Sequence, residues 1–405
     1  MTHAFPPVDE QLRRIRRGAE DVFPEDELRA RLEKSRASGT PLRVKLGVDP
    51  TAPDLTLGNS VPLWKLRTFQ DLGHVAVLII GDFTAQVGDP SGRNALRPML
   101  TAETVEAHAQ TYLDQVGAIL LPERLEIRRN GEWFAQMGFM DVMRLAGRMT
   151  VAQMLERDDF EKRYREQQPI SIHEFLYPLM QGWDSVVVRA DVELGGSDQR
   201  FNLLVGRALQ KEAGQAPQAL VVNPLVPGTD GVVKMSKSYG NYVGVKESPN
   251  EQFGKCMSIP DALMGIWLTC FTDVDEARVA ELVDPARTHP RAAKEALGKA
   301  VVARYWGAAA ADAAAEEFRR VFSERQLPDE MPDLPVPAGG AALVQLLTVD
   351  PPALAKSKGE ARRLVQQGAV RLDDARLDDA EAVLDPAPGA VLKVGKRRFA
   401  RIVRA

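Results

Sequence analysis

The chain has 405 residues, of which 44% are hydrophobic and 27% charged, and its formal net charge is −4 at pH 7. These values are typical of globular proteins and exclude bulk disorder, while the length indicates two or three domains. The longest purely apolar run, residues 75–80, is far shorter than the roughly 20 residues that cross a bilayer, and two cysteines cannot form a disulfide framework. We therefore expect a cytoplasmic protein that does not enter a membrane.

Four apolar segments rich in β-branched residues are predicted to be buried strands, and helical-looking sequence separates them. They are residues 43–48, 75–80, 186–194 and 219–225. This alternation predicts a Rossmann-type parallel α/β domain over residues 1–246. Each strand runs into a polar or glycine-rich turn, and in such a sheet these turns gather at the carboxyl edge, where ligands bind.

The sequence changes character after residue 246. Residues 247–326 are rich in Ala and Glu and predict a separate α-helical domain, and the proline-rich residues 327–340 predict a linker. Residues 341–405 predict a small α+β domain, made of a basic helix and β-like segments. Because residues 351–405 carry 12 Lys or Arg against 7 Asp or Glu, we expect a polyanion to meet local basic patches here.

The strongest functional motif is KMSKS, residues 234–238, which follows a predicted strand. Two lysines and two hydroxyl groups suit a polyphosphate, whose charge needs flexible cationic partners. Glycines at 228, 231 and 240 predict a mobile loop around the motif. The alternative is a solvated basic loop, but five residues of this identity at this place in an α/β domain favour phosphate binding.

Together with KMSKS, the upstream element Thr56-Leu57-Gly58-Asn59 resembles the HIGH element of class I aminoacyl-tRNA synthetases in a degenerate form. The segments LGVDPTAPDLTLGN, GDFTAQVGDPSGR, FLYPLMQGWDS and ELGGSDQRFNL are similar to successive active-site segments of bacterial tyrosyl-tRNA synthetases. Residues from about 351 onward are similar to the small RNA-binding domain that ends those enzymes. The resemblance covers nearly the whole chain, and it implies an enzyme that activates tyrosine with ATP and transfers it to the 3′ end of tRNA(Tyr).

The resemblance also implies which residues handle ATP. Most members have histidines where this chain has Thr56 and Asn59, but tryptophanyl enzymes carry Thr-x-Gly-Asn, and both side chains can donate hydrogen bonds. Asp198 matches a ribose ligand, although a helix N-cap is the alternative. The other nucleotide-binding residues implied are Gly58, Gly195, Lys234, Met235, Ser236 and Lys237. Catalytic contacts to the phosphates are implied for Thr51, Thr56, Asn59, Arg93, Arg97, Lys234 and Lys237, with ordinary surface charge as the alternative for the two arginines.

A second group of residues matches the family's tyrosine pocket. Tyr177, Gln181 and Asp184 stand at i, i+4 and i+7 of a predicted helix, which places them on one face. In the family, the residues matching Tyr177 and Gln181 lie near the substrate ammonium, and the residue matching Asp184 lies at the phenolic hydroxyl. The resemblance adds Asp49, Asp89 and Gln199, and Lys45 stands where some members place a tyrosine near the hydroxyl. The segment QGWD favours tyrosine over tryptophan.

The partners implied are tRNA(Tyr), L-tyrosine, ATP carrying Mg²⁺, and a second copy of the chain, with no dedicated metal cluster. We expect salt-sensitive tRNA contacts from the helical domain and from Arg362, Arg363, Lys396, Arg397 and Arg398. Phe399 is a candidate for stacking on an anticodon base, or equally a core residue. Three alternatives remain: tryptophanyl-type specificity, a catalytically weakened RNA-binding paralogue, and a small nucleotidylyltransferase.

Overall fold

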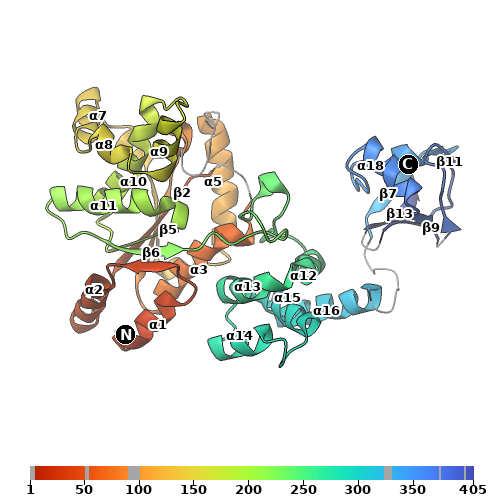
Figure 1. Ribbon diagram of the computed structural model, residues 1–405, viewed down its shortest axis with the longest axis horizontal. Helices are drawn as coiled ribbons and strands as arrows, with labels where there is room; N and C mark the ends of the chain where they lie inside the picture. The colour runs from red at the N-terminus through yellow and green to blue at the C-terminus, as the bar shows by residue number, and fades with distance from the viewer. Residues whose placement is uncertain (1–4, 51–53, 90–100, 323–330, 374, 396–397) are drawn as a thin grey trace. The chain divides into compact units, whose positions relative to one another are not determined.

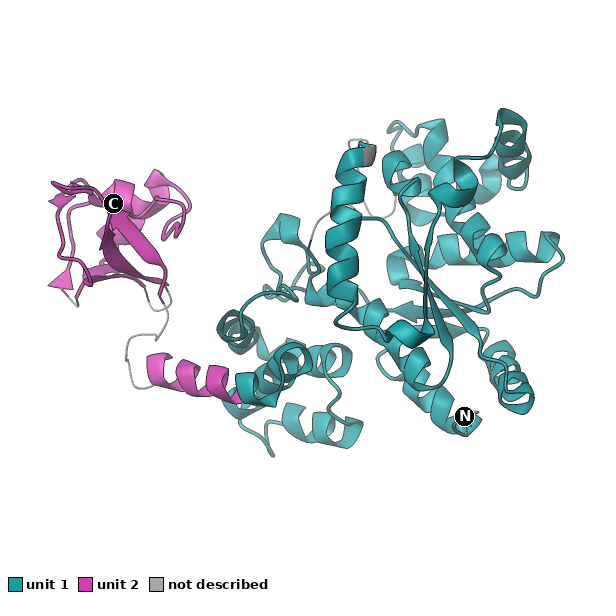
Figure 2. Ribbon diagram, turned by 180° about the vertical axis from the view of Figure 1, so that it is seen from behind, with its two compact units in different colours: residues 1–311 teal, residues 312–405 magenta. Residues whose placement is uncertain are grey.

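The computed structural model describes residues 5–50, 54–89, 101–322, 331–373, 375–395 and 398–405. They form two compact units, Met1–Ala311 and Asp312–Ala405, and the boundary falls within helix α16 (Ala308–Phe322) (Figure 2). Each unit has a hydrophobic core of its own.

The first unit contains a six-stranded sheet in the order β1-β6-β5-β2-β3-β4 (Figure 1). All neighbouring strands are parallel except β1, which runs antiparallel to β6. The strands are β1 (Asp21–Phe23), β2 (Arg43–Val48), β3 (Val75–Ile80), β4 (Leu125–Arg129), β5 (Val192–Gly196) and β6 (Ala219–Asn223). The predicted parallel α/β sheet is thus confirmed, while the short, half-exposed β1 and β4 at its edges were not predicted.

One predicted strand is partly helix. Residues 186–188 end α10 (Ile172–Val188), and β5 begins only at Val192. Val186 packs in one cluster with Val205 and Leu209 of α11 (Arg200–Glu212). The β-branched composition favoured a strand, but packing between the two helices decided the conformation.

Helices cover both faces of the sheet (Figure 1). Alternate strand residues point to opposite faces, so Leu78 of β3 joins the core beneath α1, α2 and α3, whereas Val77 packs on the other side with Val188 of α10. The helices named here are α1 (Val8–Arg16), α2 (Glu25–Ser38) and α3 (Leu57–Asp71). Further helices of this part are α4 (Thr84–Val87), α5 (Ala102–Val116), α6 (Gly131–Phe134), α7 (Phe139–Ala146), α8 (Val151–Met154) and α9 (Asp158–Arg165).

Residues 249–306 are helical, as predicted, but they belong to the first compact unit. Their helices are α12 (Pro249–Ser258), α13 (Met264–Phe271), α14 (Glu276–Val283) and α15 (Pro290–Trp306). Trp267 and Phe271 lie in the same apolar core as Leu12 of α1. The indole of Trp64 on α3 donates to the Tyr305 hydroxyl at 2.9 Å, and Tyr305 in turn bonds Ser60 of α3. A boundary at residues 246 and 247 therefore does not separate two compact units.

The second unit contains a five-stranded sheet in the order β10-β9-β12-β13-β7. Strand β7 (Asp333–Val336) lies inside the predicted linker, so that prediction is corrected for these residues. Leu334 and Val336 are buried, and Pro335 is tolerated because β7 is an edge strand. The other elements are β8 (Ala341–Ala342), α17 (Leu343–Leu346), α18 (Lys358–Gln366), β9 (Val370–Leu372), β10 (Ala375–Arg376), β11 (Val383–Leu384), β12 (Val391–Val394) and β13 (Arg398–Arg404).

The small α+β fold predicted for the end of the chain is confirmed by these elements. Over the ranges that the structure describes, no helix has both the length and the apolar character needed to span a bilayer.

Candidate active site

Asp49, directly after β2, accepts hydrogen bonds from two neighbouring segments. The Tyr177 hydroxyl on α10 donates to its Oδ2 at 2.8 Å, and the Thr84 hydroxyl donates to its Oδ1 at 2.8 Å. Gly81 makes this approach possible, because a Cβ at that position would lie 2.0 Å from Asp49 Oδ1. Burial and the charge of Asp49 raise the pKa of Tyr177 well above its ordinary value, so its hydroxyl remains a neutral donor.

Asp184 is 3% exposed and accepts hydrogen bonds from two side chains. Trp133 Nε1 donates to Oδ1 at 3.0 Å and Asn130 Nδ2 to Oδ2 at 3.4 Å. Asn130 Nδ2 also donates to Thr84 Oγ1 at 2.9 Å, which joins Asp184 to the Asp49 network. Burial raises the pKa of Asp184 to about 7, although the positive charge of Lys45 opposes this rise. The carboxyl group therefore titrates near neutral pH, and its ionised form can accept a hydrogen bond from a phenol.

Gln181 and Gln199 belong to a second network. Asn202 Nδ2 donates to Gln181 Oε1 at 2.9 Å and to Gln199 Oε1 at 3.0 Å, and Gln199 Nε2 donates to Asp89 Oδ2 at 2.8 Å. The structure thus connects Gln181, Gln199 and Asp89, which lie far apart in sequence. Asn202, which holds both glutamines, was missing from the predicted set.

Lys45 does not fit the contact predicted for it. Its side chain is fully buried, and Nζ donates at 2.8 Å to each of three acceptors: Gln181 O, Ser185 Oγ and Glu193 Oε1. An ammonium group has three N–H donors, so none is left for a substrate. A direct contact between Lys45 and tyrosine is therefore inconsistent with this structure.

Thr56 is the N-cap of α3 and forms a capping box with Asn59. Asn59 N donates to Thr56 Oγ1 at 3.2 Å, and Thr56 Oγ1 donates to Asn59 Oδ1 at 2.8 Å. Thr56 is buried, whereas Asn59 is exposed and its Nδ2 has no partner within the described part of the chain. The element is thus an ordinary helix cap that also leaves one amide group of Asn59 free to donate.

The KMSKS segment lies against this cap. Met235 Sδ accepts a hydrogen bond from Gly58 N at 3.2 Å, and a Cβ at Gly58 would lie only 3.2 Å from Met235 Cβ. Lys234 Nζ pairs with Asp198 at 3.0 Å and Lys237 Nζ pairs with Asp54 at 2.6 Å. The two motifs that dominate the sequence therefore meet in space, and both lysines project toward carboxylates.

Asn241 holds the KMSKS loop in place, although it was not among the predicted residues. Its Oδ1 accepts from Ser236 N at 2.9 Å, and its Nδ2 donates to Asp230 Oδ2 at 2.8 Å. Gly228 is required beside it, because a Cβ there would lie 2.2 Å from Asn241 O. The glycines suggested a mobile loop, but this conformation has specific internal hydrogen bonds.

Asp198 lies in the short 3₁₀ helix η2 (Ser197–Gln199), and it does not cap α11, whose N-cap is Gln199. Its carboxylate faces Lys234 instead. Gly195 allows close packing at this turn, since a Cβ would lie 3.1 Å from Leu203 Cδ1 of α11. The N-cap alternative for Asp198 is therefore excluded.

A family model described as "tRNA synthetases class I (W and Y)" matches residues 37–323, and one described as "Tyrosine--tRNA ligase SYY-like C-terminal domain" matches residues 324–402. The chain is 52% identical to the tyrosine–tRNA ligase of Symbiobacterium thermophilum over 100% of both chains. It is 50% identical to that of Moorella thermoacetica over 98% of this chain and 96% of the relative. The chain belongs to the tyrosyl-tRNA synthetases. It is thus an aminoacyl-tRNA synthetase, and the tyrosine relatives confirm the predicted preference of the sequence for the tyrosine branch.

Solved structures agree with the fold of this synthetase. A C-terminally truncated mitochondrial tyrosyl-tRNA synthetase from Aspergillus nidulans gives a TM-score of 0.63 at 24% identity, covering 78% of this chain and 94% of that one. The tyrosyl-tRNA synthetase from Archaeoglobus fulgidus, complexed with L-tyrosine, gives 0.62 at 23% identity, covering 76% and 100%.

Some predicted residues of the synthetase lie outside the described residues: Thr51, Arg93, Arg97, Lys396 and Arg397. Of the other predicted tRNA contacts, Arg362 and Arg363 are exposed on α18, with Arg362 paired to Glu381. Arg398 donates to Leu354 O and pairs with Glu360.

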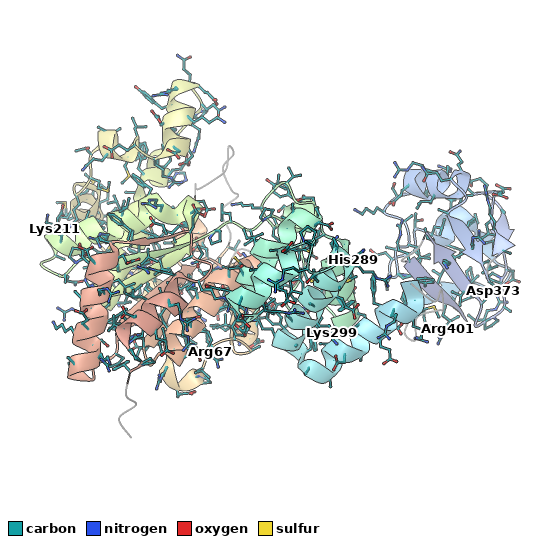
Figure 3. All side chains as sticks on the ribbon, turned by 60° about the horizontal axis from the view of Figure 1, so that its bottom comes forward. Arg67, Lys211, His289, Lys299, Asp373 and Arg401 are labelled. Atoms are coloured by element: carbon teal, nitrogen blue, oxygen red, sulfur yellow. The ribbon has the colours of Figure 1, made fainter. Side chains whose placement is uncertain are left out.

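Phe399 is a core residue of the C-terminal unit, because it is buried in a cluster with Val321 and Val391. Lys393 lies over its ring, 5.2 Å from the centroid. Arg401, labelled in Figure 3, is exposed on β13 and adds a cation to this unit. Within the described ranges of the synthetase, no group of three or more His, Cys, Asp or Glu side chains could hold a metal ion.

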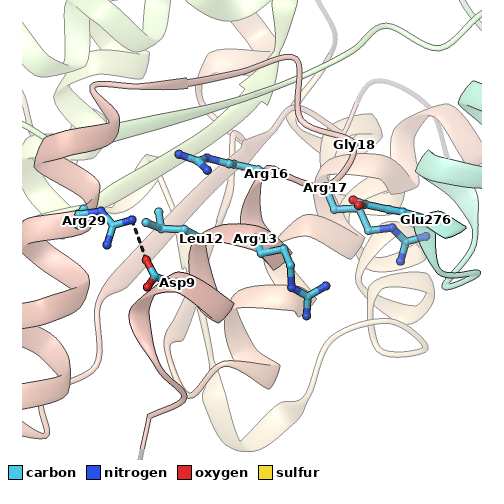
Figure 4. Close-up of a pocket in the computed structure, with 8 residues that line it drawn as sticks. All are labelled: Asp9, Leu12, Arg13, Arg16, Arg17, Gly18, Arg29 and Glu276. Atoms are coloured by element: carbon cyan, nitrogen blue, oxygen red, sulfur yellow. Dashed lines mark ion pairs between the residues drawn. The ribbon is translucent and has the colours of Figure 1, made fainter.

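A pocket of about 370 Å³ lies beside α1, and its lining includes none of the predicted site residues (Figure 4). Four arginines line it, but Arg29 pairs with Asp9 and Arg16 pairs with Glu25. Arg17 donates to the carbonyl oxygens of Thr272 and Val274. Three of the four arginines are therefore already bonded to other groups of the synthetase.

Proposed function

We propose that this synthetase activates L-tyrosine with ATP and transfers the tyrosyl group to the 3′ end of tRNA(Tyr). This proposal rests on two adjacent residues of one turn, Asp198 and Gln199, which connect the proposed phosphate site to the proposed amino-acid site. Gln199 bonds Asp89 in the network of Gln181, while Asp198 beside it bonds Lys234 of KMSKS. A phosphate site and an amino-acid site next to each other suit a reaction that joins the two substrates.

In the proposed first step, the tyrosine carboxylate attacks the α-phosphorus of ATP. A carboxyl O–P bond forms, the bond from the α-phosphorus to the bridging oxygen breaks, and pyrophosphate leaves with its electron pair. The substrate itself supplies the nucleophile, so the protein contributes positioning and charge stabilisation. Lys234 and Lys237 neutralise the leaving pyrophosphate, assisted by the phosphate contacts implied for Thr51, Thr56, Asn59, Arg93 and Arg97.

The nucleotide is proposed to lie between the first turn of α3, which contains Gly58, and the turn after β5, which contains Gly195 and Asp198. Met235 and Ser236 of KMSKS are proposed to lie beside it. Mg²⁺ is proposed to arrive with ATP, since the triphosphate oxygens are the hard ligands that this ion prefers.

The amino acid is proposed to bind between the two hydrogen-bond networks. Its phenolic hydroxyl donates to the Asp184 carboxylate, and its ammonium lies near the oxygen atoms of Tyr177, Gln181, Asp89 and Asp49, with Gln199 holding Asp89. The Tyr177 hydroxyl supports this arrangement, because it donates its proton to Asp49 and its oxygen remains an acceptor.

Tyrosine-dependent exchange between ATP and labelled pyrophosphate tests the function. We expect tyrosine, of the twenty amino acids offered singly, to support the fastest exchange. Exchange driven by tryptophan would contradict the amino-acid assignment, and no exchange with any amino acid would favour a catalytically weakened RNA-binding protein.

The proposed tRNA contacts predict a separation of two activities. A chain ending at residue 323 should keep tyrosine-dependent exchange within about twofold, because the activation residues lie in the first unit. Its tRNA charging should fall at least about tenfold, since phosphate contacts from the basic C-terminal part are lost. The cut is placed before β7, because β7 pairs with β13 of the removed sheet. Equal loss of exchange and charging, measured on one preparation, would contradict this division.

We also propose a homodimer in the cytoplasm. Phe139, Met140 and Met143 of α7 are all more than half exposed, and such an apolar surface is typical of an interface between copies. Cys256 and Cys270 are buried free thiols, which suits a reducing compartment. Light scattering should report the mass of two chains, and the mass of one chain would contradict the dimer.

A further inference from the structure

Two opposite charges face each other on neighbouring central strands. Lys45 of β2 and Glu193 of β5 are register partners in the parallel ladder, and their side chains are 0% and 1% exposed. The residues on either side of each charge are apolar and point to the opposite face of the sheet, where Leu46 and Leu194 are core residues. The two charges therefore point toward the face covered by α10 and α11.

The pair is bonded to one turn of α10. Lys45 Nζ donates to Gln181 O and Ser185 Oγ, and Glu193 accepts from Gln181 Nε2 at 3.3 Å and from Ser185 Oγ at 3.0 Å. Gln218 Nε2 also donates to Glu193. Asp184 lies between Gln181 and Ser185 in this turn.

A contribution to the overall stability of the fold does not explain why this ion pair is buried here. Burying two charges costs desolvation free energy, and apolar residues of similar volume often stabilise a core equally well or better. Every donor of Lys45 is bonded, and all three acceptors are Glu193 or residues of the α10 turn. The pair thus contacts the segment that carries two of the proposed tyrosine-binding residues.

We propose that Lys45 and Glu193 form a positioning pair for tyrosine recognition, which fixes the α10 turn carrying Gln181 and Asp184 and places a positive charge against that turn. This inference rests on the proposed function. It also gives Lys45 a role that requires no contact with the substrate.

The ionisation of Asp184 supports this role. The charged and titratable groups that act on it are Lys45 from β2, Glu193 from β5 and Tyr177 from α10, and its neutral partners are Asn130 and Trp133. Lys45 lowers the pKa of Asp184 more than Glu193 raises it. Neutralising both should therefore raise this pKa above about 7, so that less of the carboxyl group is ionised at neutral pH.

The test is the double variant Lys45→Met/Glu193→Gln, which removes both charges and leaves neither one unpaired. We expect a folded protein, a KM for tyrosine raised at least about tenfold, and a KM for ATP within about twofold of wild type. The pH midpoint of kcat/KM for tyrosine should move upward, because that profile reports the free enzyme. The preference for tyrosine over phenylalanine should fall.

The matched control is Arg163→Met/Glu174→Gln, which neutralises another buried pair that also holds α10. Its side chains are 6% and 4% exposed, but it contacts neither Gln181 nor Asp184. We expect wild-type KM values and an unchanged pH midpoint. Equal effects in both double variants would overturn the proposal, because they would show a merely structural role.

If the first double variant does not fold, Ser185→Ala provides the second test. It removes an acceptor of Lys45 and a donor to Glu193, so the KM for tyrosine should rise about two- to fivefold. A folded variant of either kind with wild-type KM and pH midpoint would overturn the proposal. Failure of wild-type tyrosine-dependent exchange would instead overturn the proposed function, so the two failures are distinguishable.

Discussion

Replacing Lys234 with alanine should lower kcat for tyrosine-dependent pyrophosphate exchange by about 10²–10³-fold, with little change in the KM for tyrosine. Loss of one donor to charge that develops in a transition state typically costs about 2.7–4 kcal/mol. The ion pair between Lys234 and Asp198 does not prevent Lys234 from binding a phosphate, because the two side chains are 42% and 22% exposed and the pair is therefore weak. Such partly exposed pairs contribute only about 0–1 kcal/mol, so a triphosphate can displace the carboxylate.

The same argument predicts little effect of this substitution on stability. The free energy of unfolding, measured by urea denaturation, should change by less than about 1 kcal/mol. Lys294→Ala is a suitable control, because Lys294 also pairs with an aspartate, Asp261, but lies on α15. A Lys234→Ala protein that loses activity only through a higher KM for tyrosine would contradict the phosphate role.

Replacing Asp184 with asparagine should lower kcat/KM for tyrosine by roughly 10- to 150-fold, while the value for phenylalanine changes little. A hydrogen bond to a charged group is worth about 1.5–3 kcal/mol, and phenylalanine has no hydroxyl to make it. The wild-type kcat/KM for tyrosine should also fall as the pH decreases through about 7, where Asp184 becomes protonated. The variant should lack this dependence, and equal losses for both amino acids would contradict the proposed contact.

Asp184 should also make stability depend on pH. Because the pKa of Asp184 is raised in the folded state, the unfolded chain loses this proton at a lower pH than the folded chain does. The folded state is therefore destabilised as the pH rises from 3.8, the ordinary pKa of the group, through about 7. The free energy of unfolding of the wild type should therefore fall by about 2–4 kcal/mol, relative to that of Asp184→Asn, between pH 4 and pH 8. Urea titrations of both proteins at the two pH values measure this difference, and parallel pH profiles would contradict it.

Much of the site was predictable because its residues follow strands or share a helix face. The turns after β2 and β5 meet at the carboxyl edge, and Tyr177 and Asp184 both join the network that begins at Asp49. The partners of Asp184 were not predictable, since Trp133 lies 51 residues away in a segment without a motif.

The role of Lys45 shows what a sequence pattern can and cannot supply. Lys45 and Glu193 each interrupt an apolar strand, which is an available signal for a buried pair. Recognising that they bond each other required the order of the strands, because β2 and β5 are neighbours only in space. The error at residues 186–188 has a related origin, since helix packing there overrides the β-branched composition.

Helix α3 contacts two parts of the first unit that differ in their proposed roles. Its first turn forms the cap that meets Met235, and its middle is fastened through Trp64 and Ser60 to Tyr305 of α15. Pro62 lies inside the helix between Ser60 and Trp64 and cannot donate a backbone hydrogen bond, so the side-chain bonds on both sides of it help to hold the helix in place. The helix that begins beside KMSKS is therefore bonded directly to the helical residues 249–306, so a substitution at Tyr305 removes a contact only one helical turn from Thr56.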